Sequence, residues 1–436
     1  MGRLSIVVVF VLATLSLLAE GILKQGWMEA LLLAPVVLFL LKDTSDILQN
    51  VLLALSSICL TLSGVDLAVR PFINDQLHYT PFNAYTRKLP ELSIVGRWDP
   101  NLDVVRESYG DLASMSGQPS FREWRQIRFQ TDEAGFRNRT RSGKIDLLIL
   151  GDSFGAGGGT TQDKLFSRVL ERKYGLRTYN LSYPGGPYDE FVNFAIESPK
   201  LTFAPHAIVV WTWYIGNDLA DSAGEIFDVG QLPWNNKLEA WLVKYRTFKN
   251  RSPMNQWWQA IQSRRANHGG EVMVRSLPNG QPILFVSGHD WWGLQSKQAI
   301  EHHPNFDKNE RTLEAMKRLV AEKGLNLVVL VLPTKGEVYR WIVEGRDPRP
   351  EDAEPSGFTL AVLAACGRVH VQCLDTKPYL VEQGRRLFAS SGNLLWWRDD
   401  SHLGEYGHAT IAEFIASNIL KDILEERLTT TEPEYE

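Results

Sequence analysis

After residue 144, apolar runs of strand length alternate with segments of helical pattern, and this alternation narrows the available folds more than any other feature. The order strand, helix, strand is typical of a parallel sheet with helices on both faces. We predict strands at Ile145–Leu150, Thr178–Leu181, Ala207–Tyr214, Leu325–Leu332 and Arg368–Leu374. We predict helices at Phe166–Tyr174, Tyr188–Glu197, Asn309–Lys323, Phe358–Ala365 and His408–Arg427. The expected fold is a doubly wound, flavodoxin-like α/β domain on a mostly parallel sheet of about five strands.

Three apolar runs open the chain, at Leu4–Leu23, Trp27–Leu41 and Ile47–Val69. A helix needs about 20 apolar residues to cross the hydrocarbon core, so we expect residues 1–70 to form about three transmembrane helices. The second run is the weakest, because it is short and contains Glu29 and Pro35. Arg3 precedes the first run, and positive charge favours the cytoplasmic side. We therefore expect a multi-pass cell-membrane protein whose part after Arg70 is extracytoplasmic, periplasmic or extracellular; the orientation inverts if the second run lies in the interface.

The rest of the chain divides into a connector and a main domain. Residues 71–144 are polar and rich in Asp, Arg, Tyr and Pro, so we expect an irregular connector packed on the core. Residues 145–430 form the expected α/β domain. Within it, residues 221–303 break the alternation and are rich in tryptophan. We interpret them as an insertion over the carboxyl ends of the strands, where ligands bind in such sheets.

Charge and cysteine content set two further limits. A net charge of −5 gives no general attraction to nucleic acid, so no nucleic-acid partner is expected. The three cysteines are not spaced as metal ligands. Cys366 and Cys373 could pair outside the cytosol or remain buried free thiols, and we favour the thiols.

The segment Gly151-Asp152-Ser153-Phe154-Gly155 follows directly on the first predicted strand of the main domain. A serine at a strand end becomes a nucleophile only with a histidine base and donors for an oxyanion. The segment also fits the Gly-x-Ser-x-Gly elbow of α/β-hydrolases, but that fold places several strands before its elbow. A phosphate loop would need Gly-Lys-Ser/Thr and a dinucleotide fingerprint a final glycine, and this segment has neither. Taken alone, an idle serine in a glycine-rich turn fits it equally well.

Three further polar segments are expected at the same edge of the sheet. Asn180-Leu181-Ser182-Tyr183-Pro184-Gly185-Gly186 follows the second strand, and Gly216-Asn217-Asp218 follows the third. Asp399-Asp400-Ser401-His402 precedes the last helix. Because the carboxyl ends of parallel strands meet at one edge, we expect these segments to lie beside Ser153.

Together the four segments resemble the sequence blocks of the SGNH (GDSL-like) hydrolase family: Gly-Asp-Ser, a glycine-containing turn, Gly-Asn-Asp and Asp-x-x-His. The resemblance implies that Ser153 is the nucleophile, that His402 is its general base, and that Asp399 orients the base. An Asp-x-His spacing, as in some acetyltransferase relatives, would select Asp400 instead; we favour Asp399.

The same resemblance implies an oxyanion hole. Its donors would be the backbone amides of Ser153 and Gly185 and the side-chain amide of Asn217. No metal and no organic cofactor is implied.

Two shorter segments add to the resemblance. Thr131–Arg137 looks like the lead-in of bacterial members, and Pro333–Lys335 with Tyr339 is similar to a segment of alginate O-acetylation proteins. We therefore expect a membrane-anchored serine esterase or O-acyltransferase acting on acyl, in the first instance acetyl, esters of a cell-surface glycan or lipid-linked sugar. A membrane-bound acyl donor protein is a candidate partner. The alternative is a catalytically inactive domain of this family that serves as a glycan-binding or assembly module.

Overall fold

The structure is a computed structural model that describes residues 80–139, 143–221, 224–252, 272–287 and 293–421, with five isolated positions between 57 and 68. It divides into two compact units, residues 1–78 with 241–266 and residues 79–240 with 267–436. The three predicted membrane runs lie outside the described residues, apart from those five positions in the third run. Within the described ranges, no helix is both long and apolar enough to cross a membrane. The predicted site residues all belong to the second unit.

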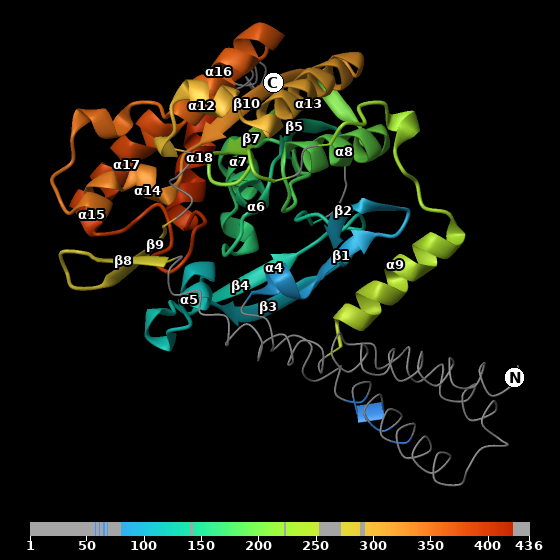
Figure 1. Cartoon of the computed structure of the whole chain (residues 1–436), viewed down its shortest axis with the longest axis horizontal. Helices are drawn as coiled ribbons and strands as arrows, with labels where there is room; N and C mark the ends of the chain where they lie inside the picture. The colour runs from blue at the N-terminus through green and yellow to red at the C-terminus, as the bar shows by residue number, and fades with distance from the viewer. Residues whose placement is uncertain are drawn as a thin grey trace, which may run out of the picture. The chain divides into compact units, whose positions relative to one another are not determined.

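The second unit is built on a five-stranded parallel sheet. Its strands are β5 (Ile145–Leu150), β6 (Thr178–Asn180), β7 (Phe203–Tyr214), β10 (Asn326–Leu332) and β11 (Gln372–Asp375). They lie in the order β11-β10-β7-β5-β6, and each neighbouring pair is parallel. Figure 1 labels the three middle strands, β10, β7 and β5. In chain order this is the 2-1-3-4-5 arrangement of flavodoxin-like sheets. The predicted parallel α/β sheet is confirmed. The fifth strand begins later than predicted, at Gln372, because Arg368 and Val369 still belong to the preceding helix, α16 (Gly357–Val369).

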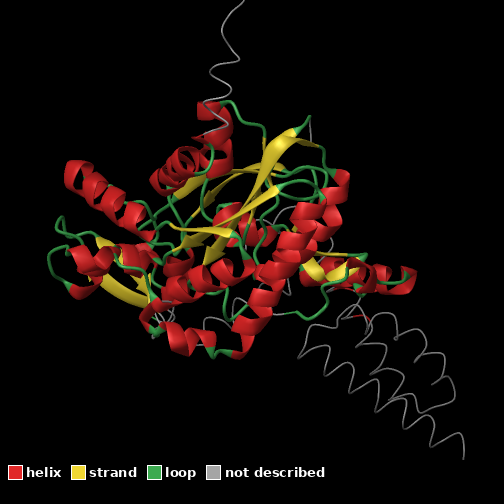
Figure 2. Ribbon diagram, turned by 90° about the horizontal axis from the view of Figure 1, so that it is seen from above, coloured by secondary structure: helices red, strands yellow, loops and turns green. Residues whose placement is uncertain are grey.

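Helices cover both faces of this sheet (Figure 2). The face to which Leu148 points carries α8 (Pro187–Glu197), α13 (Pro304–Glu322) and α16 (Gly357–Val369). The face to which Ile149 points carries α7 (Phe166–Tyr174), α17 (Lys377–Ser391) and α18 (Glu405–Asn418). Consecutive residues of a strand point to opposite faces, so the apolar strands are buried on both sides. The five predicted helices are present, and α17 is an addition to them.

Residues 80–139 pack on the core through Trp98 and Phe129, but they form helices and strands instead of the irregular chain that we expected. They form α4 (Pro81–Ala84), β1 (Thr86–Leu89), β2 (Leu92–Trp98), β3 (Asp103–Ser108), α5 (Asp111–Ser116), η1 (Pro119–Phe121) and β4 (Arg125–Gln130). β1 pairs with β2 and β3 with β4, both antiparallel. Ile127 and Phe129 of β4 are buried, whereas Arg128 between them is exposed. For β3 and β4 the polar composition therefore reflects antiparallel strands with exposed residues between less exposed ones.

The predicted insertion, residues 221–303, is described in part. It contains η4 (Val229–Gln231), α9 (Lys237–Asn250), the antiparallel strands β8 (Val272–Ser276) and β9 (Pro282–Val286), and α12 (Lys297–Glu301). The Leu284 amide of β9 donates to the Arg398 carbonyl at 2.9 Å, so this strand borders the segment that precedes His402. Four of the tryptophans that define the insertion lie outside the described residues: Trp257, Trp258, Trp291 and Trp292.

The remaining helices are short. They are α6 (Ser153–Ala156), η2 (Gln162–Lys164), η3 (Ser198–Lys200), α14 (Lys335–Val338), α15 (Arg340–Glu344) and η5 (Pro350–Ala353). Two of them, α6 and α14, begin at the carboxyl ends of β5 and β10 and carry polar residues of the site described below.

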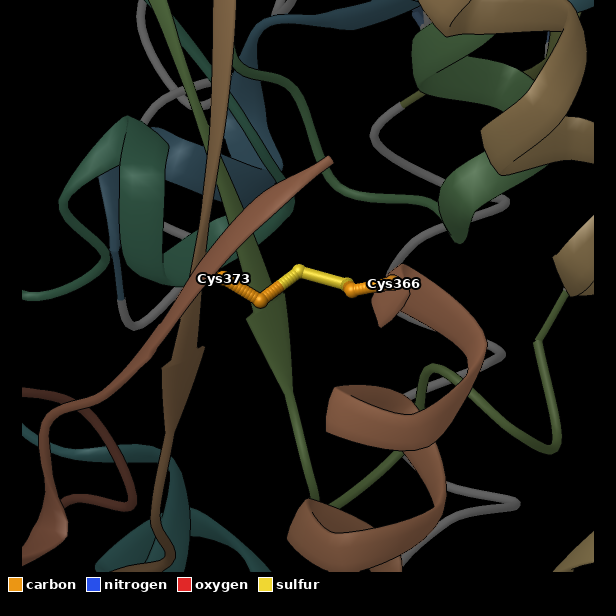
Figure 3. The surroundings of a disulfide bond; sticks show 2 residues. All are labelled: Cys366 and Cys373. Carbon is orange, nitrogen blue, oxygen red and sulfur yellow. A yellow bond between two sulfur atoms is a disulfide. The ribbon is translucent and has the colours of Figure 1, made fainter. Parts of the chain in front are cut away.

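Cys366 and Cys373 form a disulfide, so the preference for free thiols is wrong (Figure 3). Cys366 lies on α16 and Cys373 on the edge strand β11, with their Cα atoms 6.1 Å apart. His370 ends α16 in the left-handed conformation with φ 56°, and the chain then reverses into β11. This tight return brings the two cysteines within the Cα separation that a disulfide spans.

Candidate active site

Ser153 lies at the carboxyl end of β5, where the chain turns into α6. The Asp152 side chain caps α6 by accepting a hydrogen bond from the Phe154 amide at 2.8 Å. Gly155 has no room for a side chain, because a Cβ atom would lie 2.4 Å from Oγ of Ser182. β5 lies between β7 and β6, where the strand order reverses and where open α/β sheets bind ligands. The serine is thus presented at the expected edge.

The side chains of Ser153, His402 and Asp400 are joined end to end. Nε2 of His402 lies 2.9 Å from Oγ of Ser153, and Nδ1 of His402 lies 2.8 Å from Oδ1 of Asp400. A Cβ atom at Gly158 would lie 2.7 Å from Cδ2 of His402, so the glycine-rich loop after α6 leaves room for the imidazole. A hydroxyl, an imidazole and a carboxylate in this order have the geometry of a catalytic triad.

The carboxylate that contacts His402 is Asp400, which corrects the preference for Asp399. Oδ1 of Asp400 also accepts from the His402 backbone amide at 3.1 Å. This local Asx turn keeps the Asp400 carboxylate on the side of the imidazole ring. Asp399 faces the other way and accepts from two backbone amides of residues 110–123, at 2.7 and 2.8 Å, and from Arg125 at 2.8 Å. The Asp-x-His spacing therefore describes this site.

A second carboxylate, that of Asp111 at the start of α5, lies beside this pair. Its Oδ2 is 3.7 Å from Nδ1 of His402, and its Oδ1 accepts from the Ser401 amide at 2.8 Å. Burial lowers the pKa of His402, but the hydrogen bond and charge of Asp400 and the charge of Asp111 outweigh it and raise this pKa to about 9. Burial and the charge of Asp400 raise the pKa of Asp111 to about 7.

The positive charge of Arg125 offsets the negative charges of Asp400 and Asp399. Its guanidinium lies 2.6 Å from Oδ2 of Asp400 and 2.8 Å from Oδ1 of Asp399. Burial opposes ionisation of Asp400, but the hydrogen bond to His402 and the charges of His402 and Arg125 hold the pKa of Asp400 below its usual range. Asp400 therefore stays an anion at neutral pH and favours the protonated form of the imidazole.

The three predicted oxyanion donors lie after three neighbouring strands, β7, β5 and β6. The Ser153 amide begins α6, Gly185 lies in the turn between β6 and α8, and Asn217 follows β7. A Cβ atom at Gly185 would lie 2.6 Å from Oδ2 of Asp189, so a side chain here would displace the Asp189 carboxylate. Nδ2 of Asn217 donates to Asp221, and the amide group carries a second hydrogen that can be donated to a ligand.

Arg137, the last residue of the Thr131–Arg137 segment, holds the loop after α6 through hydrogen bonds. Its buried guanidinium donates to the carbonyls of Gly157 and Thr160 at 2.7 and 3.1 Å. Gly157 has φ 77°, a left-handed conformation that favours glycine. The Thr131–Arg137 segment, which resembles the segment before the first strand in bacterial family members, therefore fixes the loop next to His402.

Three polar side chains that contact the loop around His402 were not predicted as site residues: Asp111, Arg125 and Lys335. Asp111 and Arg125 come from the region predicted to be irregular, and no spacing in the sequence links them to His402. Lys335 follows β10 at the same edge of the sheet as Ser153. Because it directly follows a predicted strand, the sequence could have indicated that Lys335 lies near the site.

Asp111, Asp400 and His402 place ligand atoms within 4.8 Å of one another, a grouping that could hold a metal ion. These atoms have protein partners: Asp400 pairs with His402 and Arg125, and Asp111 accepts from Ser401. The contacts suit a serine–histidine–aspartate group with a second acidic side chain beside it.

Residues 285–435 match the family model of the SGNH hydrolase-like domain of the acetyltransferase AlgX. No curated protein matches the chain significantly. Among solved structures, a protein from Desulfitobacterium hafniense described as lipolytic and of the G-D-S-L family is 12% identical, and the match covers 62% of this chain and 97% of that chain with a TM-score of 0.31. A second structure is 15% identical over 64% of this chain and 97% of its own length, with a TM-score of 0.30. The family match confirms the predicted resemblance to SGNH hydrolases and acyltransferases.

Proposed function

Because residues 285–435 match an SGNH hydrolase-like domain, we propose that this chain is a serine esterase or O-acyltransferase that forms an acyl-enzyme on Ser153. The observation that supports this most directly is the contact of Ser153 with His402 at 2.9 Å and of His402 with Asp400 at 2.8 Å. Ser153 is the nucleophile and His402 its general base. Asp400 orients the imidazole and stabilises the imidazolium that forms.

In the first half of the reaction, Oγ of Ser153 attacks the carbonyl carbon of an ester while Nε2 of His402 takes the hydroxyl proton. The carbonyl electron pair moves onto its oxygen and gives a tetrahedral oxyanion. When this intermediate collapses, the bond to the alcohol oxygen breaks and that oxygen takes the proton from Nε2 of His402. The acyl group is then esterified to Ser153.

The oxyanion is stabilised by donors at three strand ends. We assign this role to the amides of Ser153 and Gly185 and to Nδ2 of Asn217. Removal of one such donor typically costs about 3 kcal/mol of transition-state stabilisation. The donors are fixed by the backbone of β5, β6 and β7, so little reorganisation is needed during the reaction.

In the second half, an acceptor hydroxyl attacks the acyl carbon with His402 again as base. The acceptor is water in an esterase and a sugar hydroxyl in an acyltransferase. Both routes use the same residues of this site. The match to the domain of an acetyltransferase supports an acetyl group as the acyl moiety.

We further propose that this chemistry takes place outside the cytoplasm, at a membrane, on a glycan or lipid-linked sugar. Two observations support this location. The first seventy residues contain three apolar runs, and Cys366 and Cys373 form a disulfide, a bond that persists in oxidising compartments. A membrane-bound acyl donor protein would supply the acyl group.

Acyl release by the full-length protein in lipid nanodiscs tests the proposal. With p-nitrophenyl acetate as donor, we expect Ser153→Ala to lower kcat by at least about 10³-fold. Ser390→Ala, an exposed serine on α17, is the matched control and should retain the wild-type rate. An added oligosaccharide that gains an acetyl group identifies a transferase, and free acetate alone identifies an esterase.

Equal rates for the wild type and Ser153→Ala would contradict the proposal. That result, together with retained binding of oligosaccharides, would support the alternative of an inactive module for glycan binding or assembly.

A further inference from the structure

Lys335 lies at the edge of the sheet that carries the proposed triad, but no step of the proposed chemistry uses it. It follows β10 as the first residue of α14 and is 4% exposed. A lysine is rarely buried to this extent without specific partners. Its partners therefore indicate why a cation is placed here.

The ammonium group of Lys335 contacts the loop that precedes His402. Its Nζ lies 2.6 Å from the Trp397 carbonyl, 3.0 Å from the Arg398 carbonyl and 3.1 Å from the Asp400 carbonyl. A protonated lysine has three N–H donors, so three carbonyl acceptors match its full capacity. The ring of Phe285, from β9, lies 5.3 Å from Nζ and adds a cation–π contact.

The segment that contains Lys335 is itself fixed and contacts the same loop a second time. The Thr334 hydroxyl accepts from the Glu337 amide at 3.1 Å, and the Glu337 carboxylate accepts from the Thr334 amide at 2.9 Å. This capping box fixes the start of α14. The buried Tyr339 hydroxyl accepts from the Leu395 amide at 2.7 Å. Lys335 and Tyr339 thus hold two points of the loop that ends at His402.

We propose that Lys335 is a positioning residue, whose ammonium holds the carbonyls of residues 397, 398 and 400 and so fixes the Asp400 side chain against His402. This inference rests on the proposed function, because it assigns Lys335 a role in the same site. Without the ammonium, three carbonyls in a buried loop lose a donor. A displacement of about 1 Å at a reacting group can cost about 10²-fold in rate.

The charge of Lys335 has little influence on the titration of His402. Burial lowers the pKa of Lys335 to about 7, while the nearby Asp400, Asp399, Asp111 and Glu123 favour the charged form. His402, with a pKa of about 9, therefore titrates where Lys335 is already largely neutral. Loss of Lys335 should leave the acidic limb of the activity profile in place, so its positioning role is measured by kcat and by the labelling rate at unchanged KM.

The test compares Lys335→Met with Lys377→Met in the full-length protein in nanodiscs. Lys377 is 6% exposed and pairs with Glu337 at 3.4 Å, so it is a second buried lysine next to the same segment. The measurements are the rate constant for labelling of Ser153 by a fluorophosphonate, kcat and KM on p-nitrophenyl acetate, and the pH dependence of kcat/KM. Melting temperatures are recorded for all variants.

For Lys335→Met we expect a fall of about 10- to 100-fold in kcat and in the labelling rate, with KM little changed and the acidic limb in place. Lys377→Met should lose thermal stability but keep kcat and the acidic limb. If Lys335→Met fails to fold, Tyr339→Phe, which removes the acceptor of the Leu395 amide, should show a fall in kcat with little change in KM.

The outcomes separate the two proposals. If the wild type is not labelled at Ser153, the proposed function is wrong. If the wild type is labelled and folded Lys335→Met reacts at the wild-type rate, the positioning role is wrong and the proposed function stands. An unchanged kcat in Tyr339→Phe would likewise contradict the role of the segment.

Discussion

Oδ1 of Asp400 lies 2.8 Å from Nδ1 of His402, and the neighbouring carboxylate of Asp399 is bound instead to backbone amides and to Arg125. The two adjacent aspartates therefore have different tasks. Asp400 binds and orients the imidazole of His402, whereas Asp399 links the loop around His402 to residues 110–125.

Asparagine substitutions separate these two tasks. We expect Asp400→Asn to lower kcat by about 10²- to 10⁴-fold with little change in melting temperature, because the imidazole loses its orienting anion. Asp399→Asn should mainly lower the melting temperature, because the half-buried Arg125 loses one of its carboxylate partners. Steady-state kinetics and thermal unfolding of both variants check this. A larger loss of kcat in Asp399→Asn would restore Asp399 as the orienting residue.

The pH dependence of activity depends on Asp111. Its charge, 3.7 Å from Nδ1, helps raise the pKa of His402 to about 9, so activity should rise with pH as the imidazole loses its proton. Asp111→Asn removes an anion that stabilises the imidazolium, so the pKa of His402 falls and the acidic limb of kcat/KM moves to lower pH. Asp307→Asn, an exposed aspartate on α13, is the control. A limb that stays in place, or moves to higher pH, in Asp111→Asn would contradict this coupling.

The oxyanion role of Asn217 predicts a loss in kcat rather than in KM. Asn217→Ala removes a donor that acts on the charged intermediate, so we expect kcat to fall by about 10²- to 10³-fold. KM should change little, because the ground-state carbonyl gains less from this donor than the oxyanion does. An equal rise in KM with unchanged kcat would instead place Asn217 in substrate binding.

Three buried carboxyl groups near the site should make the folded protein less stable as the pH rises. Glu190, Asp218 and Asp152 are fully buried, and Oε1, Oδ1 and Oδ2 respectively have no hydrogen-bond partner among the described residues. Burial, with mutual repulsion of the charges, raises the pKa of each carboxyl, that of Asp152 to about 6. Their stabilising effect is complete below the unfolded pKa of about 4 and is lost as pH rises through the folded values.

Glu190→Gln tests this effect, because glutamine cannot ionise yet can still accept the hydrogen bond from Nε1 of Trp211. Between about pH 6 and pH 9 the melting temperature of the variant should fall less than that of the wild type, by on the order of 2 °C per kcal/mol retained. Glu314→Gln, an exposed glutamate on α13, should follow the wild type. Parallel curves for wild type and Glu190→Gln would show that Glu190 is ionised in the folded protein.

The parallel sheet was predictable because its strands are buried on both faces and read as continuous apolar runs, as in Ile145–Leu150. Because the carboxyl ends of parallel strands meet at one edge of the sheet, the sequence also predicted that Ser153, Gly185 and Asn217 would lie close together at that edge. The antiparallel strands β3 and β4 were missed because exposed polar residues interrupt their apolar ones, which makes their composition look like that of a loop.

Spacing alone could not choose between Asp399 and Asp400. Side-chain direction decided it, through the Asx turn at Asp400 and the attachment of Asp399 to residues 110–125. Contacts between segments far apart in the chain, such as Asp111 with Ser401 across 290 positions, leave no local pattern. The disulfide was open for a local reason, since the return from α16 to β11 depends on the conformation of His370.

The most direct test of the central claim is to identify which residue forms a covalent bond with an acyl-mimetic reagent. The full-length protein in nanodiscs is treated with a fluorophosphonate, digested and analysed by mass spectrometry. We predict one adduct, on the peptide that contains Ser153. It should be lost in Ser153→Ala and form more slowly in Asp400→Asn. An adduct on another residue, or an unmodified Ser153 in an active protein, would contradict it.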